Sequence, residues 1–161
     1  MKKVAAAISM LALGGMLVGP LRSEPVAAHG KPAGHGGDRV CAKRFTDTVR
    51  QRDAAWDARD LDKLMTYYRP DAVEIDPSGA YHEDREAITE HLGMLFQLEF
   101  ESVFTEQKRI VDGCDTALLV LDSRFTAPAI GLDQHFVTAQ TFTYEQGRWR
   151  LLLAANTMLP A

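Results

Sequence analysis

The hydrophobic positions follow helical spacing in the first half of the folded region. Cys41, Phe45, Val49 and Trp56 fall on one helical face, and most of the charged residues between them lie elsewhere on the surface. This pattern predicts an amphipathic helix that ends near Ala58 and buries its apolar face.

Two more helices and a short strand are predicted before residue 100. Asp60 is placed to cap a second helix, and Pro70 is expected to stop it because proline cannot continue the hydrogen-bond ladder. The apolar positions of this helix are Leu61, Leu64, Met65 and Tyr68. Residues 72–75 form a short predicted strand, which the turn residues Pro77-Ser78-Gly79 end. A third helix is expected at about residues 85–98.

From Phe100 onwards the hydrophobic period changes to two, which is typical of strands. Asp112-Gly113 and Glu145-Gln146-Gly147 form turn signals between such segments. The predicted strands cover residues 100–111, 116–127, 134–144 and 148–159. Helices first and strands afterwards predict an α+β fold.

Two of these strands are apolar on both faces. Residues 118–121 and 151–155 do not alternate, although an antiparallel sheet with one wet face should alternate apolar with polar residues. One face can pack on the helices, and the other needs cover as well. The lost alternation therefore predicts a homodimer formed through the outer sheet face.

The N-terminal segment resembles an export signal. Lys2 and Lys3 precede an uncharged apolar run, and Val26-Ala27-Ala28 supplies the small residues that signal peptidase requires. We expect a signal peptide at 1–28, a flexible linker at 29–37 and one domain at 38–161. The alternative is an uncleaved membrane anchor. With cleavage after Ala28, the domain would be secreted or periplasmic and free of the membrane.

Charge and cysteine content narrow the functional classes. The formal net charge is -4, and no Lys/Arg cluster exists, so neither nucleic acid nor an anionic membrane surface is an expected partner. Cys41 and Cys114 are the only cysteines. An even pair in an exported chain predicts one disulfide, which would tie the first helix to the sheet.

Asp76 and His91 are the first candidates for chemistry. Asp76 ends the short predicted strand, where a carboxylate in a pocket wall can shuttle a proton if burial raises its pKa. The alternative is that this aspartate only bonds the backbone of its own turn. His91 lies near the apolar stripe of the third helix, either as a catalytic group or as a hydrogen-bonded residue at the edge of the core.

Further candidates are polar residues within apolar strands. Arg124, Gln140 and Asn156 are costly to bury unless they have partners or face a cavity. Trp56 and Tyr68 could supply aromatic walls for a ligand. Alternatively, they belong to the core, and Arg124 pairs with Asp122 or Glu101 on the outer face. His82, His91 and a carboxylate could hold a metal, but no short His-x-His pair is present, so we expect no metal site.

Three motifs together resemble a known superfamily. They are Trp56 near the end of the first helix, Asp84-Arg85-Glu86-Ala87-Ile88 followed by His91, and Trp149-Arg150 followed by Asn156-Thr157. Their order is similar to that in the nuclear transport factor 2-like superfamily, which includes SnoaL-like polyketide cyclases and ketosteroid isomerases, and within it to the SgcJ/EcaC-type branch. The resemblance covers residues 45–159. It implies a cone-shaped fold with three N-terminal helices on a curved, mostly antiparallel sheet.

The resemblance also implies a site. Asp76 stands where ketosteroid isomerases carry their general-base aspartate, but Arg52 replaces their helix tyrosine, and Ala155 replaces a histidine common in relatives. It implies a cofactor-independent isomerase, cyclase or hydrolase acting on a hydrophobic, oxygenated small molecule. Asp76 would be the base, with His91, Asn156 and Arg124 orienting the substrate or stabilising developing negative charge. The predicted substrate-binding residues are Trp56, Tyr68, Arg124 and Gln140. The alternative is a non-catalytic binding or dimeric association module of the same fold.

Overall fold

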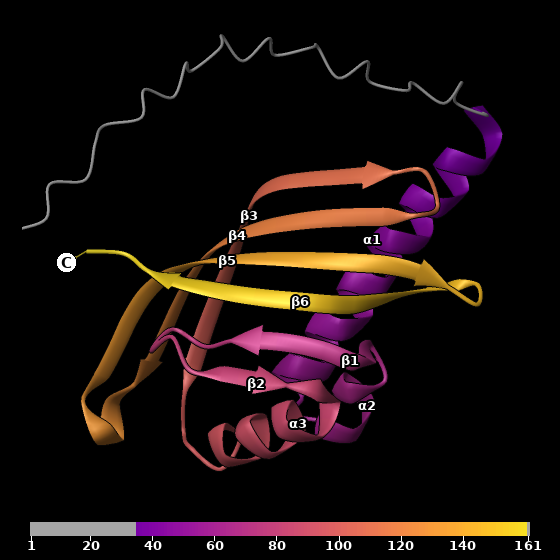
Figure 1. Cartoon of the computed structure of the whole chain (residues 1–161). Coiled ribbons are helices and arrows are strands. Elements are labelled where there is room, and N and C mark those ends of the chain that lie inside the picture. Colours follow the sequence, from indigo (N-terminus) through magenta and orange to yellow (C-terminus); the bar gives the residue numbers. More distant parts are fainter. Residues whose placement is uncertain (1–34, 161) are drawn as a thin grey trace, which may run out of the picture. The chain divides into compact units, whose positions relative to one another are not determined.

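The structure, a computed structural model, describes residues 35–160 (Figure 1). The helices are α1 (His35–Asp57), α2 (Leu61–Met65) and α3 (Asp84–Leu95), with a 3-10 turn at Pro128–Ile130. The strands are β1 (Tyr68–Ile75), β2 (Tyr81–Glu83), β3 (Glu101–Asp112), β4 (Thr116–Ala127), β5 (Leu132–Glu145) and β6 (Arg148–Met158). They form one sheet in the order β2-β1-β6-β5-β4-β3, in which only β1 and β6 run parallel. The predicted α+β fold is confirmed.

The core lies between α1 and one face of the sheet. Phe45 of α1 packs edge-on against Phe142 of β5 and Trp149 of β6, with ring centroids 5.1 and 5.3 Å apart. The indole N–H of Trp149 donates to the backbone carbonyl of Cys41 at 3.1 Å, which satisfies the only polar atom of this buried ring. A disulfide joins Cys41 to Cys114 and fixes α1 to the turn between β3 and β4, as predicted.

Strand β1 begins earlier than the sequence indicates. Pro70 lies within this strand and does not end a long second helix, because α2 stops at Met65 and the chain pairs with β6 from Tyr68 onwards. The register shifts between Tyr68 and Val73. Such an irregularity tolerates a proline, which has no N–H to donate to the ladder. The prediction of a helical Tyr68 was therefore wrong.

The N-terminal end of α1 lies within the segment expected to be a linker, since the helix begins at His35. The predicted signal peptide and its cleavage site lie outside the described residues. Within the described part, no helix is long and apolar enough to cross a membrane.

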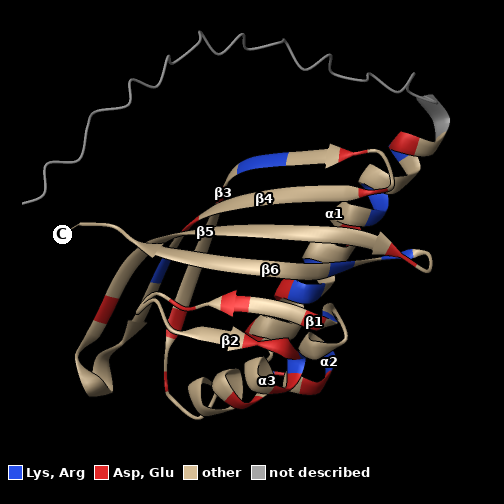
Figure 2. Cartoon of the chain, viewed as in Figure 1, with Lys and Arg blue, Asp and Glu red and all other residues tan. Residues whose placement is uncertain are grey.

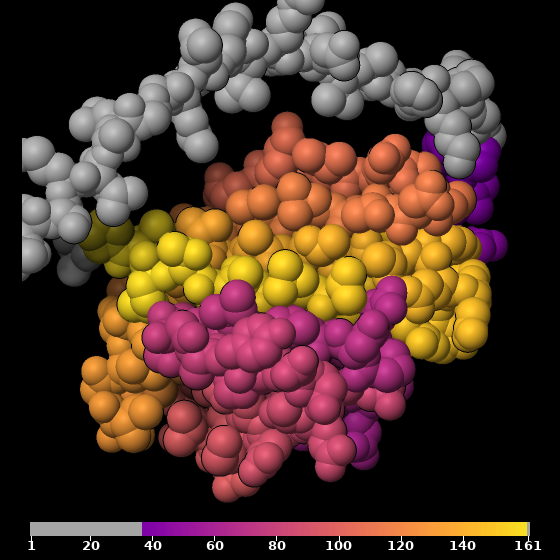
Figure 3. Space-filling model, in the orientation of Figure 1, coloured from indigo at the N-terminus to yellow at the C-terminus, as the bar shows by residue number. Residues whose placement is uncertain are grey.

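Charged residues are scarce along the central strands. Residues 116–121, 134–144 and 151–158 contain no Asp, Glu, Lys or Arg, and Figure 2 shows these parts of β4, β5 and β6 in tan. Figure 3 views the sheet from the side opposite α1, where none of the described helices covers β4 to β6. One face of the sheet is therefore packed and the other remains open.

Candidate active site

A cavity of about 230 Å³ lies between the helices and the inner face of the sheet. Its apolar wall comes from α3 and from the ends of β4 and β5. The residues of that wall are Leu92, Leu95, Phe125, Leu132 and Phe136. The polar wall includes every predicted catalytic residue, because Asp76, His91 and Asn156 all line this cavity. Segments far apart in sequence thus converge on one site.

Asp76 is held firmly at the end of β1. Its Oδ1 accepts hydrogen bonds from the backbone N–H of Ser78 (2.8 Å), the Ser78 hydroxyl (2.6 Å) and the backbone N–H of Ala80 (3.0 Å). Its Oδ2 lies 3.4 Å from Nε2 of His82. Burial raises the pKa of Asp76, but the hydrogen bonds from Ser78, Ala80 and His82 outweigh it, and the net pKa is lowered. Asp76 is therefore an ionised turn residue that also faces the cavity.

Glu74, two residues earlier, is the acidic group with a raised pKa. The residue is 8% exposed, lines the cavity and makes no hydrogen bond to another described side chain or backbone group. Its Oε2 is buried without a partner. Burial, together with the negative charge of Asp76, raises the pKa of Glu74 to about 7. Two neighbouring carboxyl groups thus have pKa values that their surroundings drive in opposite directions, which is typical of acid–base sites.

Glu74 was not predicted as a site residue from the sequence, although the alternation of the strand indicates that it faces the same side as Asp76. Ala72, Glu74 and Asp76 alternate along β1, and side chains two apart in a strand share a face. Any strand that brings Asp76 to a pocket therefore brings Glu74 to the same side.

A second polar group comes from α1, β1 and β5. Arg52 donates from Nε and Nη2 to the Asp53 carboxylate (3.0 and 2.6 Å) and from Nη1 to the Gln140 side-chain oxygen. Tyr68 lies beside them. Burial raises the pKa of Tyr68, the charge of Glu74 raises it further and that of Arg52 lowers it, so the phenol stays protonated. The predicted ligand-binding residues Tyr68 and Gln140 both line the cavity.

Asn156 lines the cavity but is bound on both sides. Its Oδ1 accepts from the hydroxyl of Thr138 (2.8 Å), and its Nδ2 donates to the backbone carbonyl of Ile75 (2.8 Å). The Thr138 hydroxyl also lies 2.9 Å from that of Ser123. This chain of hydrogen bonds links β4, β5 and β6 to the end of β1. Asn156 therefore serves to position the backbone just before Asp76.

His91 projects from α3 into the cavity and stacks on His82, with ring centroids 4.0 Å apart and 22° between the planes. Burial and the neighbouring His82 lower the pKa of His91, so its imidazole is neutral near neutral pH. Asp76, His82 and His91 offer ligand atoms within 4.8 Å of one another. A histidine nitrogen binds a metal in the plane of its own ring, however. The planes of two stacked rings are nearly parallel, so one ion cannot lie in both planes. A metal would require one ring to rotate.

Two further candidates have different outcomes. Trp56 lines the cavity and donates from Nε1 to the Ser102 hydroxyl at 2.8 Å. Arg124 does not line the cavity: its side chain is 62% exposed and pairs with Asp133 at 2.8 Å. Arg124 lies between Ser123 and Phe125, which face the core, so the alternation of β4 directs it to the outer face. Arg124 therefore lies outside the cavity in which the other predicted site residues meet, and its acidic partner is Asp133 and not Asp122 or Glu101.

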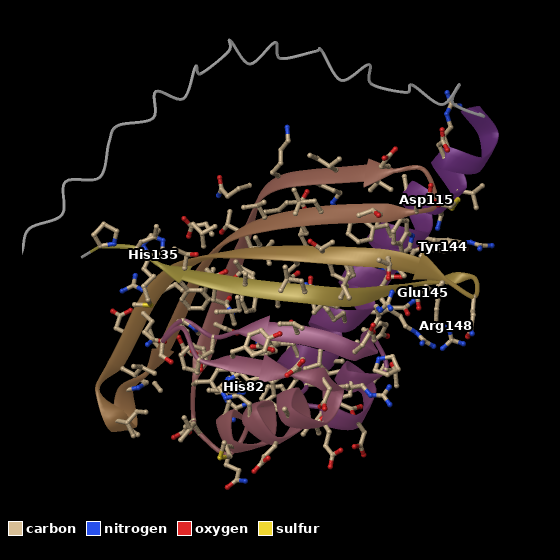
Figure 4. All side chains as sticks on the ribbon, in the orientation of Figure 1. His82, Asp115, His135, Tyr144, Glu145 and Arg148 are labelled. Atoms are coloured by element: carbon tan, nitrogen blue, oxygen red, sulfur yellow. A yellow bond between two sulfur atoms is a disulfide. The ribbon has the colours of Figure 1, made fainter. Side chains whose placement is uncertain are left out.

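The outer face also holds a histidine that does not contribute to the cavity. His135 lies near the C-terminal end of β6, whereas His82 lies beside α3 (Figure 4). The Nε2 of His135 is 3.0 Å from a carboxylate oxygen of Asp122. This pair belongs to the open sheet face and not to the candidate site.

Residues 48–152 match the family model described as the SnoaL-like domain. No curated protein sequence matches the chain. Among solved structures, the chain is similar to a nuclear transport factor 2-like protein of unknown function from Pseudomonas putida KT2440, with 17% identity, a TM-score of 0.64, and 76% of this chain and 89% of that one covered.

Two more structural neighbours share the fold. A ketosteroid isomerase-like protein from Erwinia carotovora atroseptica SCRI1043 has 14% identity and a TM-score of 0.60 over 74% of this chain and 96% of that one. A protein from Thiobacillus denitrificans ATCC 25259, named for the calcium/calmodulin-dependent protein kinase type II association domain, has 19% identity and a TM-score of 0.60 over 70% and 93%. At such identities the likeness establishes the fold alone.

Proposed function

Because the chain belongs to the SnoaL-like domain family, we propose that its cavity binds a hydrophobic, oxygen-bearing small molecule and transfers a proton within it without a cofactor. The observation that supports this most is the Glu74 carboxyl. It is buried in the cavity wall, has no hydrogen-bond partner among the described residues, and has a pKa of about 7. A proton-transfer group works best when its pKa lies near the working pH.

The proposed reaction starts with ionised Glu74. Its carboxylate removes a proton from a carbon next to a ligand carbonyl. The C–H electron pair forms a C=C bond to the carbonyl carbon, and the π pair of the carbonyl moves to its oxygen, which gives an enolate. The Tyr68 hydroxyl donates a hydrogen bond to that oxygen. Glu74 then returns the proton to another carbon or to oxygen, so the net result is an isomerisation or the start of a cyclisation.

Asp76 has a different role in this proposal from the base expected from the sequence. Its hydrogen bonds keep it ionised and make it a weak proton acceptor. Its charge instead helps to hold the pKa of Glu74 near neutrality. His91 is proposed as a neutral donor or acceptor for the ligand, and Asn156 as the residue that positions the end of β1.

The test is hydrogen exchange at carbon. The protein is incubated in deuterated buffer with 2-tetralone, a hydrophobic ketone, and deuterium incorporation is followed by mass spectrometry. We expect exchange above the buffer rate, rising through about pH 7 as Glu74 ionises, and lost in Glu74→Gln but not in Glu90→Gln, a surface control on α3. Exchange equal in the wild-type protein and Glu74→Gln would refute the assignment of Glu74.

The second candidate function is a binding or association module, and the open sheet face favours it. Leu118 and Val120 of β4, Val137 and Ala139 of β5, and Leu153 of β6 lie on that face, because they alternate or pair with residues that point away from α1. We propose that a second copy of the chain covers this apolar surface, which would give a homodimer with either function. The disulfide is compatible with the proposed location outside the cytoplasm.

A further inference from the structure

The polar end of the cavity presents hydrogen-bond donors that have no acceptor within residues 35–160. Arg52 has five N–H groups and uses three of them, which leaves one on each terminal nitrogen. Gln140 turns its oxygen towards Arg52, so its amide NH₂ is a donor without a partner among the described residues. The Tyr68 hydroxyl also makes no hydrogen bond to any described residue. All three side chains line the cavity.

The burial of Arg52 demands an explanation, because a guanidinium inside a protein is costly unless its charge and its donors are matched. Its side chain is 7% exposed, and its carboxylate partner Asp53 is 45% exposed. Water reaches Asp53 and screens its charge, so Asp53 neutralises Arg52 only in part. A purely structural link between α1 and β5 would need only the bond to Gln140, and two N–H groups of the guanidinium remain unused after the bonds to Gln140 and Asp53.

We propose that this end of the cavity binds the carboxylate of a hydrophobic acid, with the Arg52 guanidinium as its main partner. Gln140 and Tyr68 would donate further hydrogen bonds to the same carboxylate or to a neighbouring oxygen. The apolar body would extend towards Leu95, Phe125 and Phe136. Guanidinium and carboxylate match each other in shape and charge, and such charge-assisted hydrogen bonds are the strong ones.

The acidic side chains in and beside the same cavity favour a positively charged ligand instead, so all neighbouring titratable groups must be considered. Glu74 lies on β1, Asp76 directly follows this strand, and Asp53 lies on α1. His82 of β2 and His91 of α3 lie close to Asp76. A protonated amine would bind beside Glu74 and drive it to release a proton. A bound carboxylate would instead increase the protonated fraction of Glu74, so the protein would take up protons on binding. The two ligand classes therefore differ in the sign of proton exchange.

The experiment is isothermal titration calorimetry of the full chain with three probes that share the same phenylbutyl group and differ only in the terminal group. They are 4-phenylbutyrate, 4-phenylbutan-1-ol and 4-phenylbutan-1-amine. We expect the carboxylate to bind at least about tenfold more tightly than the alcohol, and the amine most weakly. Repeating the titration near pH 7 in buffers of different ionisation enthalpy should show proton uptake with the carboxylate. Equal affinity for acid and alcohol, tightest binding of the amine, or proton release would overturn the proposal.

Variants locate the effect at Arg52. Arg52→Met should abolish the preference for acid over alcohol, Arg52→Lys should keep part of it, and Arg50→Met, the same change at an exposed site of α1, should leave it intact. If Arg52→Met fails to fold, the probe series on the wild-type protein still decides. The inference rests on the ligand-binding half of the proposed function: loss of carbon exchange with retained acid preference would refute catalysis alone.

Discussion

Replacing Glu74 with glutamine should remove a pH-dependent loss of stability. The side chain keeps its shape, but the amide cannot ionise. In the folded wild-type protein the pKa of Glu74 is raised from 4.5 to about 7, by burial first and by Asp76 second. As pH rises from about 4.5 to 7, the unfolded chain gives up this proton while the folded chain keeps it, so the free energy of unfolding falls across that window.

The magnitude follows from the size of the pKa shift. One pKa unit corresponds to about 1.4 kcal/mol, so a rise from 4.5 to about 7 gives a loss of about 3 kcal/mol, complete above pH 7. Asp76 and His91 act in the opposite direction, because their lowered pKa values add stability that is lost as pH falls. Subtracting the Glu74→Gln curve from the wild-type curve isolates the contribution of Glu74.

The assay is urea unfolding with the disulfide intact, followed by tryptophan fluorescence at steps from about pH 4 to 8.5. The stability difference between wild type and Glu74→Gln should fall by about 3 kcal/mol between pH 4.5 and 7 and then level off. Glu90→Gln, an exposed control, should show no such step. A difference that stays constant over the whole range would mean that Glu74 titrates as in the unfolded chain, and the acid–base proposal would lose its basis.

Three further changes test the disulfide, the cavity and the open sheet face. Replacing Cys41 and Cys114 with serine removes a link across 73 residues and should cost about 4 kcal/mol in urea unfolding; an unchanged midpoint contradicts this. Ala154 lines the cavity between Glu74 and Gln140, so the larger side chain of Ala154→Leu should occupy ligand space and weaken 4-phenylbutyrate binding at least about tenfold in calorimetry. Val120→Asp should convert a dimer to a monomer in light scattering, and a monomeric wild-type protein would refute the dimer.

The sequence determined the elements that depend on local pattern. The apolar face of α1, the strands from β3 to β6 and the turn at Asp76 follow from helical or alternating spacing and from turn chemistry, which act over a few residues. Strand β1 was placed too late, because its start depends on the pairing of Tyr68 with Leu151 of β6, 83 residues further along the chain, and local spacing favours helix there.

The site was predicted as a set of residues, but its chemistry was decided by the tertiary structure. Asp76, His91 and Asn156 were expected from motif positions, and all three line the cavity. Their protonation and roles depend on neighbours in space: hydrogen bonds from Ser78 and Ala80 lower the pKa of Asp76, whereas burial and the charge of Asp76 raise that of Glu74.

The different positions of Arg52 and Arg124 also depend on the tertiary structure. The sequence places Arg52 on the charged side of an amphipathic helix and Arg124 in an apolar strand, so the pattern alone gives no reason to expect that Arg52 is the buried one. The structure buries Arg52 against Gln140 because α1 packs on the inner face of the sheet. It exposes Arg124 beside Asp133 because the alternation of β4 directs this residue to the outer face. Sequence periodicity defines the two faces of each strand, but only packing against the helices decides which face encloses the site.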